Sequence, residues 1–205
     1  MITREEIERM LKEGKDIDLS FEDLEGIDLS YLDLSNITFT GSNLKNANFE
    51  GAKLEGSFIA DANLEGANFK NANLQKTVLQ RVNLRNSDFE NANLFRTAIL
   101  VSDVSKSNFK NAYMVRVRLE DSKLTECIFD YADMTYSNLR GADFQKSSFI
   151  RTKFSYSDMR KAKLSNVWFE NVEAEEVLIY GRKPWIEGSK AEVNYSKIMP
   201  SNYDD

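Results

Sequence analysis

The chain has 205 residues, of which 41% are hydrophobic and 29% are charged, and its formal net charge is −6. This composition excludes a collagen-like or low-complexity protein, and the apolar content is too high for a disordered chain. The sequence contains no histidine and one cysteine, which excludes a Cys/His zinc site, an intrachain disulfide and catalysis by histidine. No apolar run reaches the ~20 residues that a membrane-spanning helix needs. We therefore expect one ordinary domain or one elongated repeat array.

Residues 1–15 have the pattern of a short capping helix. Thr3 is a favourable N-cap, Glu6 would complete a capping box, and Gly14 is a suitable C-cap. We expect a helix over residues 3–13 whose apolar face is formed by Ile7, Met10 and Leu11, with Ile2 and Ile7 at the positions of a hydrophobic staple. Four acidic and four basic residues balance in this segment, which favours a cover for the next element over a membrane-surface helix. The segment has no apolar stretch like that of a signal peptide, so we expect a cytoplasmic protein.

From Leu19 to Phe169, every fifth residue is large and apolar. This centre column has 31 members in one uninterrupted frame, and ten of the 13 Phe residues belong to it. An α-helix turns by about 100° per residue and would scatter these residues around its axis, and a flat strand has a period of two. A chain that turns a corner every five residues keeps each centre pointing inward. Four such corners would close a square coil, so that one coil consists of four repeats.

The positions around each centre carry a second regular pattern. The residue two before the centre is Ala, Ser, Thr or Cys in 23 of 31 cases, and the residue just before it is Asp or Asn in 18. The residue two after the centre is Gly in six cases and Asn in eight. A small side chain fits an inward position beside a large one, and Gly and Asn suit a corner that needs positive φ. Such coils would stack about 4.8 Å apart, which is the spacing of hydrogen-bonded strands.

A short motif recurs at this spacing, for example at 62–64, 72–74 and 92–94 (Ala-Asn-Leu) and at 142–144 (Ala-Asp-Phe). It resembles the A(D/N)LXX motif of the pentapeptide-repeat family, and the resemblance covers residues 17 to 171. It implies an all-β fold, a right-handed quadrilateral parallel β-helix, here with about eight coils and a length of about 37 Å. The first coils depart from the small-residue pattern and should be wider; their residues at this position are Ile17, Glu22, Ile27, Leu32 and Ile37.

The pattern ends at Ala174, where a small residue occupies the next centre position. Pro184, Trp185 and Pro200 lie beyond it. We therefore expect a capping helix at 1–15, the β-helix at 16–171, and an irregular cap and tail at 172–205 with a possible short helix over 172–179. The two caps would cover the unpaired backbone at the ends of the β-helix, where open edges invite association.

The reactive side chains of the array have ordinary structural explanations. Cys127 falls at an inward small position, so a buried filler is favoured over an activated nucleophile. The many Asp and Asn residues before the centres could form carboxylate pairs or Ca²⁺ sites, but they repeat everywhere, whereas a catalytic site needs one concave place. We expect them to stack and bond to one another. The sequence thus predicts no enzyme activity, no cofactor and no metal site.

Charge is divided unevenly along the chain. Residues 16–44 contain seven acidic residues and no basic one, whereas residues 76–118 contain eight basic and three acidic residues, a local charge of +5. A solvated surface explains each block. Blocks of opposite sign would also weaken long-range attraction to nucleic acid, so binding of nucleic acid is the weaker hypothesis.

Positions one coil apart should be neighbours in space, which gathers apolar residues on the outside of the rod. Aromatic and Arg side chains in such a cluster are typical of a protein interface. The cluster, which we name the central patch, consists of Phe58, Val78, Phe95, Arg96, Ala98, Leu100, Val101, Tyr113, Val115 and Arg116. Coverage by the C-terminal tail and tolerated exposure are the alternative explanations. A second group on another face, for which coverage is favoured, consists of Ile128, Tyr131, Ile150 and Trp168.

Two functions follow from these patterns. The first is a non-catalytic protein-binding or scaffold module without a membrane, with self-association through Phe95 and Leu100 as the specific expectation. The second is implied by the resemblance, because some pentapeptide-repeat proteins imitate B-DNA, bind DNA gyrase or topoisomerase IV and protect against quinolones or toxins. The basic middle, the concentration of acidic residues in the first coils and the absence of loop insertions in the array count against this alternative. The sequence does not identify the partner.

Overall fold

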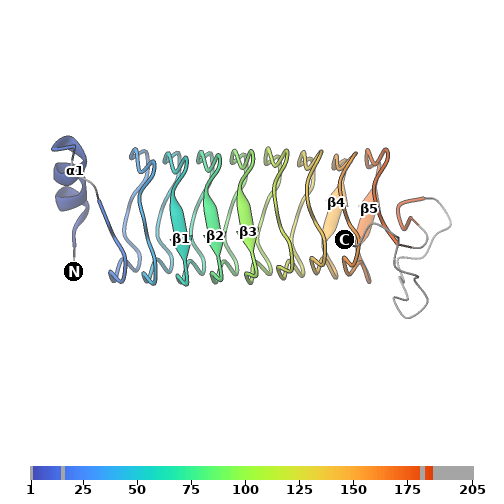
Figure 1. Cartoon of the computed structure of the whole chain (residues 1–205), viewed down its shortest axis with the longest axis horizontal. Coiled ribbons are helices and arrows are strands. Elements are labelled where there is room, and N and C mark those ends of the chain that lie inside the picture. Colours follow the sequence, from blue (N-terminus) through green and yellow to red (C-terminus); the bar gives the residue numbers. More distant parts are fainter. Residues whose placement is uncertain (1, 15–16, 181–182, 187–205) are drawn as a thin grey trace, which may run out of the picture.

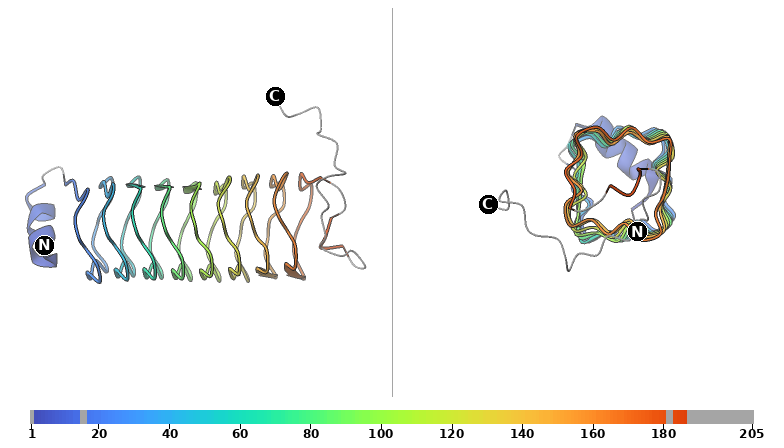
Figure 2. Two further views of the ribbon diagram at one scale, coloured as in Figure 1. Left: turned by 90° about the horizontal axis from the view of Figure 1, so that it is seen from below. Right: turned by 90° about the vertical axis from the view of Figure 1, so that its right-hand side faces the viewer.

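Stacked coils of the chain form a rod with a helix across one end (Figure 1). The computed structural model describes residues 2–14, 17–180 and 183–186. Viewed along the rod, the coils superimpose as a square outline (Figure 2). The elements in chain order are α1 (Arg4–Lys12), β1 (Phe58–Ala60), β2 (Val78–Gln80), β3 (Ala98–Leu100), β4 (Ser148–Ile150) and β5 (Trp168–Glu170).

The register of the coils is four repeats throughout. Parallel bridges join equivalent positions of adjacent coils, from Asp18↔Thr38 to Asp158↔Leu178. The named strands keep the same register, with β1, β2 and β3 in one parallel sheet and β4 and β5 in another. Side chains four repeats apart are therefore direct neighbours, and the chain forms the parallel β-helix that the repeat predicts.

The centre column fills the interior of the rod. All of its members from Leu19 to Leu164 are buried, and Phe169 packs partly buried against them. On one side the rings of Phe49, Phe69, Phe89 and Phe109 stack with centroids 4.7 to 4.8 Å apart and planes 3° apart. The ring separation matches the coil spacing of about 4.8 Å, so stacking needs no distortion of the backbone.

The small inward position carries hydroxyl groups whose partners repeat from coil to coil. Ser57 Oγ donates to Leu34 O at 2.7 Å, and Thr77 Oγ1 donates to Leu54 O at 2.6 Å. In both cases the acceptor is the carbonyl 23 residues earlier. A buried hydroxyl without a partner costs free energy. The fixed carbonyl of the previous coil therefore makes Ser and Thr acceptable where Ala is the apolar choice.

The corners require the left-handed backbone region in every repeat. Each residue two after a centre, from Phe21 to Glu176, has φ between +47° and +72°. The sequence predicts Gly and Asn here, but Phe, Tyr, Lys, Arg and Val occupy the same conformation. Gly is demanded where the previous coil's side chain lies over the corner: a Cβ on Gly41 would lie 2.7 Å from the Phe21 ring.

Helix α1 covers the first coil as predicted. Thr3 is its N-cap, Thr3 and Glu6 form the capping box, and the C-cap is Glu13, one residue before the expected Gly14. Ile7 is fully buried in the core. Arg4 Nη1 donates to Asp28 O at 2.9 Å, which holds the helix on the rod. Within the described residues, no helix has both the length and the apolar character required to cross a bilayer.

The coils continue past the predicted boundary at residue 171. Glu173 bridges to Lys153 and Leu178 bridges to Asp158, so the short helix predicted over 172–179 is wrong. Trp185 then packs edge-on against Phe154, with ring centroids 5.0 Å apart. Phe154 and Ala174 are successive members of one inward column, and the small Ala174 leaves room for the indole. Pro200 and the rest of the predicted tail from 187 lie outside the described residues.

Candidate protein-binding surface

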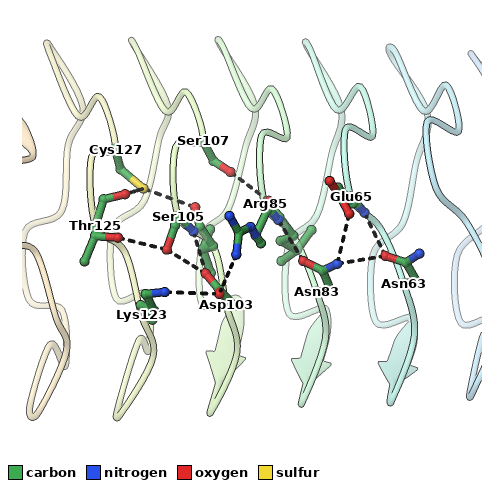
Figure 3. A network of polar contacts seen from close by, with 12 residues as sticks. Asn63, Glu65, Asn83, Arg85, Asp103, Ser105, Ser107, Lys123, Thr125 and Cys127 are labelled. Atoms are coloured by element: carbon green, nitrogen blue, oxygen red, sulfur yellow. Dashed lines mark hydrogen bonds and ion pairs between the residues drawn. The ribbon is translucent and has the colours of Figure 1, made fainter.

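The Asn and Asp residues before the centres form hydrogen-bonded ladders on the surface (Figure 3). Asn83 Nδ2 donates to Asn63 Oδ1 at 3.0 Å, and Asn83 Oδ1 accepts from the backbone N of Arg85 at 3.3 Å. Asp103 accepts from Ser105 Oγ at 2.6 Å. These contacts confirm the predicted stacking role. In the part of the chain that the structure describes, no group of three or more His, Cys, Asp or Glu residues could hold a metal ion.

Cys127 lies in the interior, as the repeat predicts, with 1% of its surface exposed. Its Sγ donates to Val104 O at 3.1 Å, and its backbone N donates to Ser147 Oγ at 2.9 Å. Burial raises the pKa of the thiol to about 12. The thiolate is the reactive form of cysteine, so this side chain is a filler and not a nucleophile.

Strands β1, β2 and β3 provide one half of the central patch, which we name the flat half. Their register sets Phe58 beside Val78 and Val78 beside Ala98. Phe58 is 41% exposed and Val101 is 60% exposed, but Ala98 is only 7% exposed. Ala98 therefore does not offer the outward contact that its sequence position predicts; it lies between Val78 and Arg118 of the adjacent coils, whose side chains are larger.

The other half of the central patch combines arginines with aromatic rings at the adjoining corner. The rings of Phe95 and Tyr113 stack with centroids 6.1 Å apart, and Tyr113 is 46% exposed. The guanidinium carbon of Arg96 lies 5.2 Å from the centre of the Phe95 ring. That of Arg116 lies 6.0 Å from the Tyr136 ring of the next coil. These cation–π contacts hold both arginines against the rod.

Sequence reasoning missed the continuation of this corner. Tyr136 and Tyr156 follow Arg116 at steps of one coil, with ring centroids 5.1 Å apart, and they are 55% and 40% exposed. The signal was present in the sequence as the alignment, from coil to coil, of residues two after the centre. We name the part of this row from Arg96 onward the corner column; its members are Arg96, Arg116, Tyr136, Tyr156 and Glu176, and Asn36, Gly56 and Lys76 precede them in the same row.

The basic block of the sequence does not form one basic surface, because successive repeats point to different sides. Several of its members are also neutralised: Lys76 pairs with Glu55 at 2.9 Å, and Arg81 pairs with Asp61 at 2.7 Å. By contrast, no carboxylate of the described residues forms an ion pair with Arg96 or Arg116. The two arginines of the central patch therefore keep their charge available.

The second apolar group lies on another face near the C-terminal end. Trp168 is 63% exposed and Ile128 is 42% exposed, so the described part of the C-terminal segment does not cover them as expected. Arg151 lies 5.9 Å from the Tyr131 ring. This group is smaller than the central patch and carries one arginine.

Three of the solved structures that are similar to the chain are described here. One is HetL, a pentapeptide repeat protein involved in heterocyst differentiation regulation from the cyanobacterium Nostoc sp. strain PCC 7120 (21% identity, 87% of this chain and 95% of that chain, TM-score 0.48). A pentapeptide repeat protein from the Arabidopsis thaliana thylakoid lumen is 35% identical over 49% of this chain and 70% of its own, with a TM-score of 0.47. QnrB1, a plasmid-mediated fluoroquinolone resistance protein, is 17% identical over 78% and 90%, with a TM-score of 0.43. No curated protein matches the chain.

The family comparison covers most of the array. The family model described as pentapeptide repeats matches in eight copies, over residues 23–58, 60–97, 102–141 and 127–166. These ranges contain more than half of the chain, and they coincide with the coils whose centres are buried and whose corners have positive φ. The chain therefore belongs to the pentapeptide repeat family.

Proposed function

We propose that the chain is a non-catalytic protein-binding module, a right-handed quadrilateral β-helix of about eight coils whose central patch contacts a protein partner. One observation carries the proposal: apolar and aromatic side chains are exposed where most outward positions of the array are polar, with Phe58 41%, Tyr113 46% and Val101 60% exposed. Clustered exposed apolar surface marks interaction sites, and aromatic and Arg residues are enriched in them. The filled interior supports a role that the surface performs.

The experiment is a comparison of captured proteins between variants. The wild-type chain, the patch variant Phe95→Arg with Leu100→Glu, and a control variant Lys106→Glu with Lys110→Glu are immobilised and exposed to host extract. Both control lysines are exposed and lie outside the patch. We expect proteins that the wild type and the control retain and that the patch variant loses, with unchanged melting temperatures. Equal retention by all three would overturn the proposal.

The alternative role as a DNA mimic has less support. A mimic of the phosphate backbone needs negative charge along the rod, whereas Arg96 and Arg116 form no ion pair with the described residues at mid-rod. We expect a gyrase supercoiling assay to show neither inhibition by micromolar protein nor protection from a quinolone. Either effect would make the DNA-mimic role better supported than the proposed protein-binding role.

A further inference from the structure

Four consecutive members of the corner column, from Arg116 to Glu176, have an order of charges that is complementary to its own reversal. Along the rod these four are a cation, two tyrosines and a carboxylate. Backbone hydrogen bonds such as Arg116 N to Thr135 O, 3.0 Å, and Tyr136 N to Ser155 O, 3.0 Å, set its members one coil apart. Each step is therefore about 4.8 Å. A second column that runs in the opposite direction would present a carboxylate to a cation at each end.

The middle of the corner column is held in place before any contact. The rings of Tyr136 and Tyr156 stack with planes 13° apart, and Arg116 lies over the first of them. Interaction with the Glu175 carboxylate raises the pKa of the Tyr156 phenol. Rigid aromatic side chains lose little conformational freedom on binding, so an exposed stack of this kind favours association.

The two ends of the corner column hold charges of opposite sign that form no ion pair among the described residues. Arg96 and Arg116 are neighbours on adjacent coils, and like charges so placed repel one another. At the other end Glu175 and Glu176 are both exposed, and neither forms an ion pair with a described residue, whereas Glu173 pairs with Lys153 at 3.2 Å. A partner that brings a carboxylate to Arg116 and a cation to Glu176 would compensate one charge at each end.

We infer that two copies of this chain associate side by side and antiparallel through the corner column, with the two-fold axis between Tyr136 and Tyr156. This inference rests on the proposed protein-binding function and deepens it. The axis sets Tyr136 against Tyr156 of the partner subunit and Arg116 against Glu176 of the partner subunit. The same contact occurs twice, once on each side of the axis, so the pair is closed and does not grow into a filament.

A parallel arrangement of the same columns is disfavoured, because it would set arginine against arginine and glutamate against glutamate. Phe95, which is next to Arg96, and Tyr113, which is on the adjoining face, lie at the rim of the antiparallel contact. Leu100 lies at the far corner of the β3 face, outside it. The inference thus separates the contact between copies from the flat half of the central patch, which stays open to another protein.

The test uses sedimentation equilibrium of the full chain and of charge-reversal variants. The wild type is expected at twice its chain mass of 23.5 kDa, with a dissociation constant that rises with salt because the charges are exposed. Arg116→Glu alone and Glu176→Arg alone should each raise that constant at least tenfold, about 1.4 kcal/mol. Lys106→Glu reverses a charge at another corner, in the same left-handed conformation, and should leave the constant unchanged.

Mixing the two single variants gives the sharpest result. In an antiparallel pair formed by one copy of each, both charged contacts again join opposite signs, so Arg116→Glu and Glu176→Arg should form a heterodimer with a lower dissociation constant than either homodimer. A wild type that stays monomeric, an Arg116→Glu variant that matches Lys106→Glu, or a mixture that stays monomeric would each overturn the inference.

These failures are distinguishable from a failure of the proposed function. If the mixture fails while Phe95→Arg with Leu100→Glu still abolishes capture of other proteins, the central patch remains a binding surface and only the contact between copies is wrong. If the mixture succeeds while capture is equal for all variants, the copies associate and the partner protein is wrong.

Discussion

The corner residue two after each centre is the most demanding single position in this rod. Its backbone is left-handed in every repeat, and yet Phe21, Tyr31 and Val101 adopt that conformation. For a residue with a Cβ this region costs roughly 1–2 kcal/mol, and the regular bonds between coils hold it in place. The glycines at these corners differ in their surroundings. The cost of backbone strain can therefore be separated from the cost of steric contact with a neighbouring side chain.

Two glycine substitutions separate backbone strain from steric contact. Gly26 and Gly41 both have φ of +67°, but a Cβ on Gly26 meets nothing within 4 Å, whereas one on Gly41 lies 2.7 Å from the Phe21 ring. Gly26→Ala should destabilise the rod by about 1 kcal/mol through strain alone. Gly41→Ala should cost more, because the ring must also move. Urea unfolding of both variants measures the difference, and equal losses would show that the ring moves freely.

At the scale of the element, the centre column illustrates how one interval of five produces two kinds of packing. Leu centres are buried in the interior, and the Phe centres of one face form a stack whose spacing equals that of the coils. The frame, the buried centres, the small inward position and the bounds of α1 to within one residue were all predictable, because each follows from local periodicity or from capping residues.

The position of the C-terminal boundary was not predictable in the same way. Ala174 breaks the pattern of large centres, but the space that it leaves is filled by Trp185 from outside the frame, with its ring 5.0 Å from that of Phe154. Val177 is 6% exposed and restores the inward pattern. A side chain from a different segment that fills this space is not part of the periodic pattern. The pattern therefore predicts an array shorter than the one observed.

Removal of one ring from the Phe stack should remove packing contacts with both neighbouring rings. Phe89 lies between Phe69 and Phe109 with centroids 4.7 Å away on each side. Phe89→Ala should destabilise the protein by about 3–5 kcal/mol, because a cavity opens in a rigid interior. Phe89→Leu keeps a large centre of the type used on the other faces and should cost less. Chemical denaturation compares them; equal losses would mean that ring stacking, and not volume, decides stability here.

At the scale of the whole molecule, the square winding redistributes charge that the linear sequence groups together. The acidic residues between Asp18 and Asp33 spread around all sides of the first coils, and the basic block spreads around the middle ones. Sequence position alone locates the central patch because the patch needs only the register of the coils. It places Ala98 on the surface and overlooks Tyr136, Tyr156 and Glu176, because burial depends on the size of neighbouring side chains and the pattern assigns the corner positions to turns alone.

The acidic coils should make stability depend on pH. Hydrogen bonds from the hydroxyl and backbone of Ser30 lower the pKa of Asp28, and bonds from Ser20 and Ser35 lower the pKa values of Asp18 and Asp33. A carboxyl with a lowered folded pKa stabilises the protein above its unfolded value near 3.9 and loses that contribution as pH falls through the folded value. The melting temperature should therefore fall as pH decreases below about 4.

A variant with Asp18→Asn, Asp28→Asn and Asp33→Asn provides the control. The array uses Asn at equivalent positions, where Asn63 and Asn68 accept the same backbone bonds, and Asn does not titrate. Its melting temperature should change less between pH 7 and pH 3 than that of the wild type, which scanning calorimetry measures. An identical acid response in both proteins would assign the loss to carboxylates elsewhere in the rod.

The unbroken frame also restricts how this protein can change in length. Four repeats added or removed together would lengthen or shorten the rod by one coil and leave the residues of every surface row aligned. A single repeat inserted between Arg116 and Tyr136 would instead turn everything after it by a quarter turn, so that Tyr156 and Glu176 would face a different side from Arg116. Any surface that depends on several coils is therefore tied to insertions and deletions in whole multiples of the coil.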